Sequence, residues 1–418
     1  MGIFYFCEIK FNSQWWWKKL TDVCQRWRHI IFASPRFLNL HLLCTDKTPT
    51  RTSLDIWPQF PIIIVYDYRS KLDDEGQDNI IAALEQHDRV IQIDLRYLPE
   101  TFSTAMQKPF PVLKDLRLFS ADEIAPVLHE EFLGGSTPHL RYFCLINIAF
   151  LELPKLALFC SSLSRLILLS IPIAGYISPE AMATCLATLP SLREFTIGFK
   201  SPRSRPNRIG RPPPTRVILP TLDHFEFKGV SEYLEDLVAR IDTPKLVWLK
   251  IQLFMDLMFN IPQLHKFIVR TERMRSLNSA EILFYHWASV IRSVPAIKLE
   301  IICREPDWQA SSMAQVCSQL SPLLSRMEQL AIFEDTPGQT RKGNGLDPTQ
   351  LFELFDPFPA MQHLHIYGEL GPLITRALQE LTGERATEVL PSLRRLVFES
   401  PPSSESMQKD IQGFITAR

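Results

Sequence analysis

The sequence lacks the short signatures that mark common catalytic and metal sites. It contains no Gly-x-Ser-x-Gly nucleophile elbow, no glycine-rich dinucleotide fingerprint and no Gly-Lys-Ser/Thr phosphate loop. The run Gly134-Gly135-Ser136 has no closing glycine, and His363 and His365 share a strand face without a third metal ligand. We therefore predict a protein that is not an enzyme and that binds neither a metal nor a cofactor.

Net charge, long apolar runs and paired cysteines are also scarce. The chain has 45 Lys and Arg against 46 Asp and Glu, so no overall field attracts nucleic acid or an anionic membrane. No window approaches the roughly 18 uninterrupted apolar residues of a membrane-spanning helix. The eight cysteines form no Cys-x-x-Cys pair, and no signal peptide is recognisable. These features favour a cytoplasmic or nuclear protein without a membrane or nucleic-acid partner.

A short phrase recurs along the chain. In residues 189–197, a proline precedes apolar residues at Leu192, Phe195 and Ile197, with the spacing Leu-x-x-Leu-x-Leu of a strand that has one buried face. Further copies follow Pro111, Pro138, Pro220, Pro244, Pro262 and Pro391, and looser copies follow Ser162, Ser325 and Pro359. Recurrence at roughly 18 to 35 residues is typical of a solenoid, in which each unit buries its face against its neighbours.

The links between these phrases have helical character. Residues 122–129 and 179–188 are typical of helices, and Asp78 can cap a helix that follows a solvated turn at 73–76 and leads into a strand near 90–95. We expect the first strand at residues 62–66. Alternation of strand and helix predicts a parallel sheet with helices on its outer side, an α/β leucine-rich-repeat-like solenoid.

A helical segment precedes the repeats. Its apolar residues are three and four positions apart, on one helical face; they are Leu20, Val23, Cys24, Trp27, Ile30 and Ile31. With the Ser34-Pro35 turn behind it, the segment resembles the second half of an F-box, with the Val-Cys-x-x-Trp-Arg core at residues 23–28. The Leu-Pro-x-Glu helix that opens an F-box does not stand upstream of Leu20.

The chain from Trp57 onward resembles fungal F-box proteins with degenerate leucine-rich repeats. The phrases that carry the likeness are Ala82–Glu85, Ala280–Ile282, Asp307–Gln309 and Ala377–Leu381. The resemblance implies a non-catalytic adaptor of an SCF-type cullin–RING ubiquitin ligase, in which the helical segment binds a Skp-type adaptor and the repeats bind a protein target. The alternative is a leucine-rich-repeat interaction scaffold without a ligase role, whose N-terminal helices only cap the repeats.

The strand phrase also predicts which side chains face away from the core. Residues beside the inward-facing pair form a mixed surface with aromatic and basic elements, a composition that protein interfaces favour. As target contacts we select Arg117, Tyr142, Arg165, Glu194, His224, Glu226, Trp248, Lys250 and Lys266. The alternative is a solvated strand face. In regular leucine-rich repeats a buried asparagine follows the strand, but we assign that position to Ala121, Ile148, Ile171 and Lys200, which predicts an irregular solenoid.

These patterns give a provisional division of the chain. The predicted segments are an unassigned start at 1–19, truncated F-box-like helices at 20–46, a polar linker at 47–53, the solenoid at 54–400 and a polar tail at 401–418. Two insertions interrupt the solenoid. Residues 200–216 carry six Lys or Arg, no acid and three consecutive prolines, and residues 335–347 are polar. We expect both to be solvated loops. For the basic loop, contact with an acidic partner, with nucleic acid or with a proline-recognising partner stays open as an alternative.

Overall fold

The chain divides into two compact units in a computed structural model. The first comprises Met1–Tyr176 with Thr188–Leu192, and the second comprises Ile177–Ala187 with Arg193–Arg418. The structure describes residues 23–33, 41–56, 59–66, 72–202, 215–255, 259–274, 277–293, 296–303, 306–335, 348–367, 374–375 and 390–399. Among the helices in these ranges, none has the length and apolar character needed to cross a membrane.

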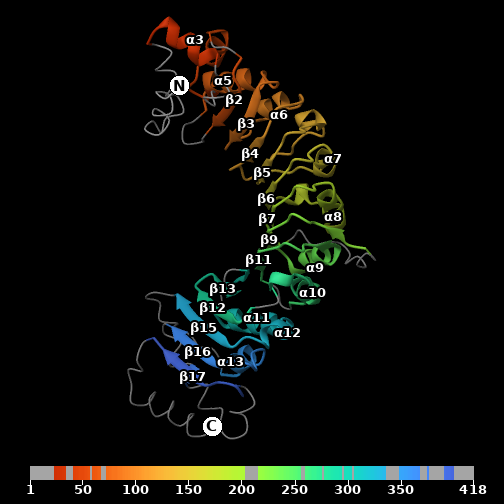
Figure 1. Cartoon of the computed structure of the whole chain (residues 1–418), viewed down its shortest axis with the longest axis vertical. Helices are drawn as coiled ribbons and strands as arrows, with labels where there is room; N and C mark the ends of the chain where they lie inside the picture. The colour runs from red at the N-terminus through yellow and green to blue at the C-terminus, as the bar shows by residue number, and fades with distance from the viewer. Residues whose placement is uncertain are drawn as a thin grey trace. The chain divides into compact units, whose positions relative to one another are not determined.

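The first unit alternates strands with short helices. Its elements are α3 (Gln25–Ala33), β1 (Leu42–Cys44), α4 (Thr50–Ile56), β2 (Ile62–Tyr66), α5 (Asp74–Leu84), β3 (Val90–Leu95), α6 (Glu100–Ala105), β4 (Asp115–Phe119), η1 (Phe132–Gly135), β5 (Tyr142–Ile146), α7 (Leu153–Ala157), β6 (Arg165–Ile171) and η2 (Ile173–Gly175). Strands β1 to β6 lie in chain order, each parallel to the next. The helices that link them lie on one side of the sheet (Figure 1).

The second unit continues the same rhythm with one interruption. Its elements are α8 (Pro179–Ala187), β7 (Glu194–Phe199), β8 (Val217–Ile218), β9 (His224–Gly229), α9 (Ser231–Arg240), β10 (Ile241–Asp242), β11 (Trp248–Phe254), α10 (Pro262–Arg270), η3 (Glu272–Met274), β12 (Ser279–Tyr285), β13 (Ala288–Ser293), β14 (Ile297–Ile302), α11 (Pro306–Gln319), α12 (Ser321–Leu324), β15 (Gln329–Asp335), α13 (Pro348–Phe355), β16 (His363–Tyr367) and β17 (Arg395–Phe398). The strand order is β7-β9-β11-β14-β13-β12-β15-β16-β17. Among the described strands, only β13 runs antiparallel to its neighbours. Strands β8 and β10 form a separate parallel pair.

The recurrent phrase forms the strands, as predicted. In the copy after Pro220, Leu222, Phe225 and Phe227 are buried, because alternate side chains of a strand share a face. The ring of Phe225 stacks on that of Phe195 in the neighbouring copy, with ring centroids 5.5 Å apart. Equivalent positions of adjacent copies therefore form the core, as in a solenoid. The predicted fold class, an α/β leucine-rich-repeat-like solenoid, is confirmed.

One copy of the phrase was wrongly assigned to a strand. Pro262 begins helix α10, in which Leu264, Phe267 and Ile268 are buried. Their spacing of three and four residues suits a helical face as well as it suits the phrase. Lys266 therefore lies on a helix and not on the strand face to which we assigned it.

Two of the predicted links also differ. The residues 73–76 predicted as a turn form the cap and first turn of α5, where the Asp73 side chain accepts a 2.8 Å hydrogen bond from the Gly76 amide, so Asp78 is not the cap. Residues 122–129 are not helical. Val127 instead forms a parallel bridge with Ala149. Helix α8 and strands β2 and β3 agree with the prediction.

A buried asparagine was missed after strand β5. Asn147, one residue before the position that we assigned, donates from Nδ2 to the carbonyls of Ser120 (3.0 Å) and Asp122 (2.8 Å). Its φ is 57°, in the left-handed region that asparagine tolerates. A buried asparagine of the kind found in regular leucine-rich repeats is therefore present here. It donates hydrogen bonds to backbone carbonyls at the start of the loop that we expected to be a helix.

The sheet begins earlier than expected. Strand β1 pairs in register with β2, Leu42 opposite Ile62 and Cys44 opposite Ile64, so residues 62–66 are not the first strand. Helix α4 begins within the segment predicted as a linker. The start 1–19, the tail 401–418 and most of both insertions lie outside the described residues.

Candidate functional site

Helix α3 carries the residues proposed to bind an adaptor. Val23, two residues before the helix, is 62% exposed, and Ile30 is 43% exposed. Cys24 is exposed and Trp27 is half-buried. Phe32 contacts Phe60 edge to face, with ring centroids 5.6 Å apart. The helix is therefore attached to the first repeats through Phe32, while the apolar side chains of Val23 before it and Ile30 within it face solvent. Leu20 and the side chain of Ile31 lie outside the described residues.

In the first unit, three predicted contact residues meet on the open face of the sheet, the face opposite the linking helices. The guanidinium carbon of Arg117 lies 4.6 Å from the centre of the Tyr142 ring, and that of Arg165 lies 5.8 Å from it. Arg117 Nη1 is also 3.7 Å from Asp94 Oδ2. Tyr142 is thus placed between two cations on β4, β5 and β6, an arrangement that favours a planar or anionic contact group. Asp94 was missed, although it occupies an alternate position of strand 90–95.

In the second unit, the open face carries a row of charged side chains across five strands. Register places Glu226, Lys250, Lys298, Arg292 and Glu281 side by side on β9, β11, β14, β13 and β12. Lys250 Nζ is 3.1 Å from Glu226 Oε2, and Arg292 Nε is 2.5 Å from Glu281 Oε2. Three basic side chains therefore lie between two acids. Of this row, only Glu226 and Lys250 were selected from the sequence.

Three further selected residues lie in a neighbouring row of the same face. Glu194, His224 and Trp248 are in register on β7, β9 and β11. His224 Nδ1 is 2.6 Å from Asp223 Oδ1. The row combines an aromatic ring with ionisable groups, as the phrase predicted.

Glu300 is an acid buried within this face. Its side chain accepts a 3.0 Å hydrogen bond at Oε1 from Gln252 Nε2, and its Oε2 is 3.1 Å from Lys298 Nζ. A buried carboxylate is tolerated only with such partners. Gln252 lies on β11 and Lys298 on the neighbouring strand β14, so the contacts with Glu300 fix the side chains of both residues.

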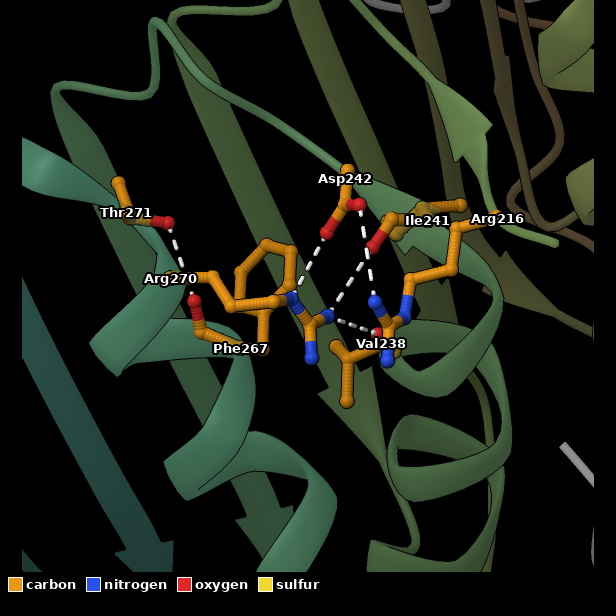
Figure 2. A network of polar contacts seen from close by, with 7 residues as sticks. All are labelled: Arg216, Val238, Ile241, Asp242, Phe267, Arg270 and Thr271. Carbon is orange, nitrogen blue, oxygen red and sulfur yellow. Dashed lines mark hydrogen bonds and ion pairs between the residues drawn. The ribbon is translucent and has the colours of Figure 1, made fainter. Parts of the chain in front are cut away.

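A second polar network fastens α10 to the segment before it (Figure 2). Arg270 donates from Nε to Asp242 Oδ1 (2.7 Å) and from Nη2 to the carbonyls of Val238 (3.1 Å) and Ile241 (3.3 Å). Arg216 Nη1 is 3.8 Å from Asp242 Oδ2. Burial lowers the pKa of Arg270, and the charge of Asp242 opposes that shift. This network was not predicted, because 28 residues separate Asp242 from Arg270.

Helix α9 supports α10 at its other end. The Glu235 carboxylate accepts hydrogen bonds from the amides of Gln263 and Leu264, both 2.7 Å long. These amides belong to the first turn of α10, whose donors have no partner within the helix. Burial raises the pKa of Glu235 to about 7, although the two hydrogen bonds and Lys266 lower it.

The described residues offer little for catalysis. Nowhere in the described ranges do three or more His, Cys, Asp or Glu side chains gather as a metal site would require. His363 and His365 both lie on β16, half-buried. Burial raises the pKa of the Cys44 thiol to about 11 and also raises that of Cys317, so these thiols are poor nucleophiles.

Comparison with known proteins finds only weak similarity to this chain. No protein-family model and no curated protein matches the chain. Among solved structures, the leucine-rich repeat-containing protein LegL7 from Legionella pneumophila is similar at 13% identity and a TM-score of 0.30, covering 76% of this chain and 94% of that one. A complex of TLR13 with ssRNA13 is similar at 14% identity and 0.32, covering 85% of this chain and 46% of that one. The fold assignment rests on the strand register described above, and no activity is carried over from either protein.

Proposed function

We propose that this chain is a non-catalytic protein-interaction scaffold whose open strand face binds a protein target. The observation that carries the proposal is the polar and aromatic face itself. Arg117, Tyr142 and Arg165 stack across three strands of the first unit, and the row from Glu226 to Glu281 crosses five strands of the second. Arginine and aromatic side chains are enriched among the residues that dominate binding energy.

The test of the scaffold is affinity purification of the tagged chain from its source cells. We compare the wild type with a charge-reversed Arg117→Glu/Arg165→Glu variant, and Arg51→Glu serves as the control because this exposed arginine lies on α4, outside the strand face. Loss of the same co-purified protein from the face variant alone supports the proposal. An unchanged set of co-purified proteins, with the variant folded, rejects it.

Within this scaffold, we further propose that α3 binds a Skp-type adaptor, so that the bound target is presented to a cullin–RING ubiquitin ligase. The exposure of Val23 and Ile30 supports this role, because a helix that only capped the repeats would bury them. The Val-Cys-x-x-Trp-Arg core adds to that support. The contact of Phe32 with Phe60 favours the alternative, a cap without a ligase role.

Co-expression with a Skp-type adaptor separates the two roles. Ile30→Asp is the informative variant, because an exposed side chain can become charged without disturbing the core, whereas Trp27→Ala also removes buried surface. Adaptor retained by the wild type and lost with Ile30→Asp, at an unchanged melting temperature, supports the adaptor role. No retention by the folded wild type rejects that role and leaves the scaffold.

A further inference from the structure

Two adjoining hollows lie near the C-terminal end of α10 in the second unit. The first has a volume of about 280 Å³ and lies against the β8–β10 pair and the end of α10. Ile218, Pro244 and Phe267 provide its apolar wall, and Asp242, Thr243 and Arg270 provide its polar side. The second hollow, of about 480 Å³, shares Pro244 with the first.

The polar side of the first hollow has unused hydrogen-bond donors. Thr243 is only 4% exposed, and its hydroxyl has no hydrogen-bond partner among the described residues. Arg270 uses Nε and Nη2 for Asp242 and two carbonyls, and among the residues drawn in Figure 2 no dashed line joins its Nη1 to an acceptor. A buried hydroxyl without a partner is unfavourable. A ligand that accepts hydrogen bonds here removes that cost.

Charge points to an anionic ligand. Around the first hollow, Arg216 and Arg270 face a single acid, Asp242. Around the second, Arg193, Lys245 and Arg273 outnumber Asp223 and Glu272. Arg216 lies outside the lining of the first hollow but 3.8 Å from Asp242, and when it is counted the described residues at each hollow have an excess of one positive charge, which attracts an acidic segment.

We propose that the first hollow binds the C-terminal residue of a protein partner and that the second holds the acidic residues preceding it. The terminal carboxylate accepts hydrogen bonds from Thr243 and Arg270. The aliphatic side chain of the same C-terminal residue packs on Ile218, Pro244 and Phe267. A C-terminal aliphatic residue places a carboxylate and an apolar group within one residue, as this small hollow requires. A free carboxylic acid would leave the second hollow unused.

Fluorescence anisotropy with the full chain tests the proposal. The probe is a fluorescein-labelled hexapeptide with three acidic residues and a C-terminal leucine, compared with the same peptide as its C-terminal amide. We expect the amide to bind about tenfold more weakly or worse, because the charge-assisted hydrogen bonds are lost. Thr243→Val should weaken the free acid several-fold without lowering the melting temperature, because the hydroxyl makes no internal hydrogen bond.

Ile218→Asp introduces a repelling carboxylate at a side chain that is 66% exposed, and Ile173→Asp, at 58% exposure in the first unit, is its matched control. Loss of binding with Ile218→Asp alone supports the assignment. Equal affinity for the acid and the amide, equal effects of the two variants, or no binding to the folded chain overturns it. Competition by N-acetyl-leucine as strong as that by the unlabelled peptide overturns the peptide as the occupant.

Discussion

The buried carboxylate of Glu235 gives the protein a predictable dependence of stability on pH. Burial raises its pKa in the folded chain from 4.5 to about 7, so the folded state holds this proton more tightly than the unfolded state does. Between these pH values the folded chain binds more protons, and the free energy of unfolding therefore falls as pH rises. At about 1.4 kcal/mol per pKa unit, the loss through this group is about 3 kcal/mol.

The Glu235→Gln variant isolates this contribution, because glutamine has nearly the same shape and does not titrate. Urea unfolding followed by circular dichroism, at about pH 4.5 and about pH 7.5, gives the difference in unfolding free energy between wild type and variant. We expect the wild type to lose about 3 kcal/mol relative to the variant across this range. Glu272→Gln, at an exposed acid, controls for the loss of a negative charge. A wild type that instead gains stability relative to Glu235→Gln would refute the reasoning, since the amides of α10 would then outweigh burial.

Three further outcomes follow from the contacts. Asn147→Ala should lower the free energy of unfolding by about 2–4 kcal/mol, measured by thermal unfolding, because the carbonyls of Ser120 and Asp122 lose their donor and alanine must adopt a positive φ. Maleimide labelling of the native chain, read by mass spectrometry, should modify exposed Cys24 and spare Cys44, whose thiol is buried with a raised pKa; prompt labelling of Cys44 would contradict the β1–β2 pairing. Lys250→Met should change stability by less than about 1 kcal/mol, because its ion pair with Glu226 is partly solvated, and a larger loss in urea unfolding would count against that.

Local spacing was sufficient to predict the fold class and most of the strands that carry the recurrent phrase. Phe225 and Phe227 are buried because a strand turns alternate residues to one face, and the next copy provides the same surface for stacking. The open face follows from the same alternation. Arg117, Tyr142 and Arg165 were therefore found from the sequence, together with their position on adjacent strands.

What the sequence did not reveal depends on partners far apart in the chain. The residues after Ile261 fit a strand and a helix equally well, and Glu235 on α9 helps to select the helix by satisfying its first amides. Strand β13 is antiparallel and carries no copy of the phrase, so Arg292 was not placed beside Lys298. The hollow near Arg270 likewise requires β8, β10 and α10 to meet, which no local pattern encodes.

Site-specific photo-crosslinking in source cells tests the central claim, that the open strand face binds a protein. Benzoylphenylalanine replaces Tyr142 or Trp248 on that face, and it replaces Phe159, an exposed aromatic in the link between β5 and β6, as the matched control. We predict covalent adducts with the same partner protein from Tyr142 or Trp248 and none from Phe159. Adducts that form at Phe159 and at neither face position would contradict the account.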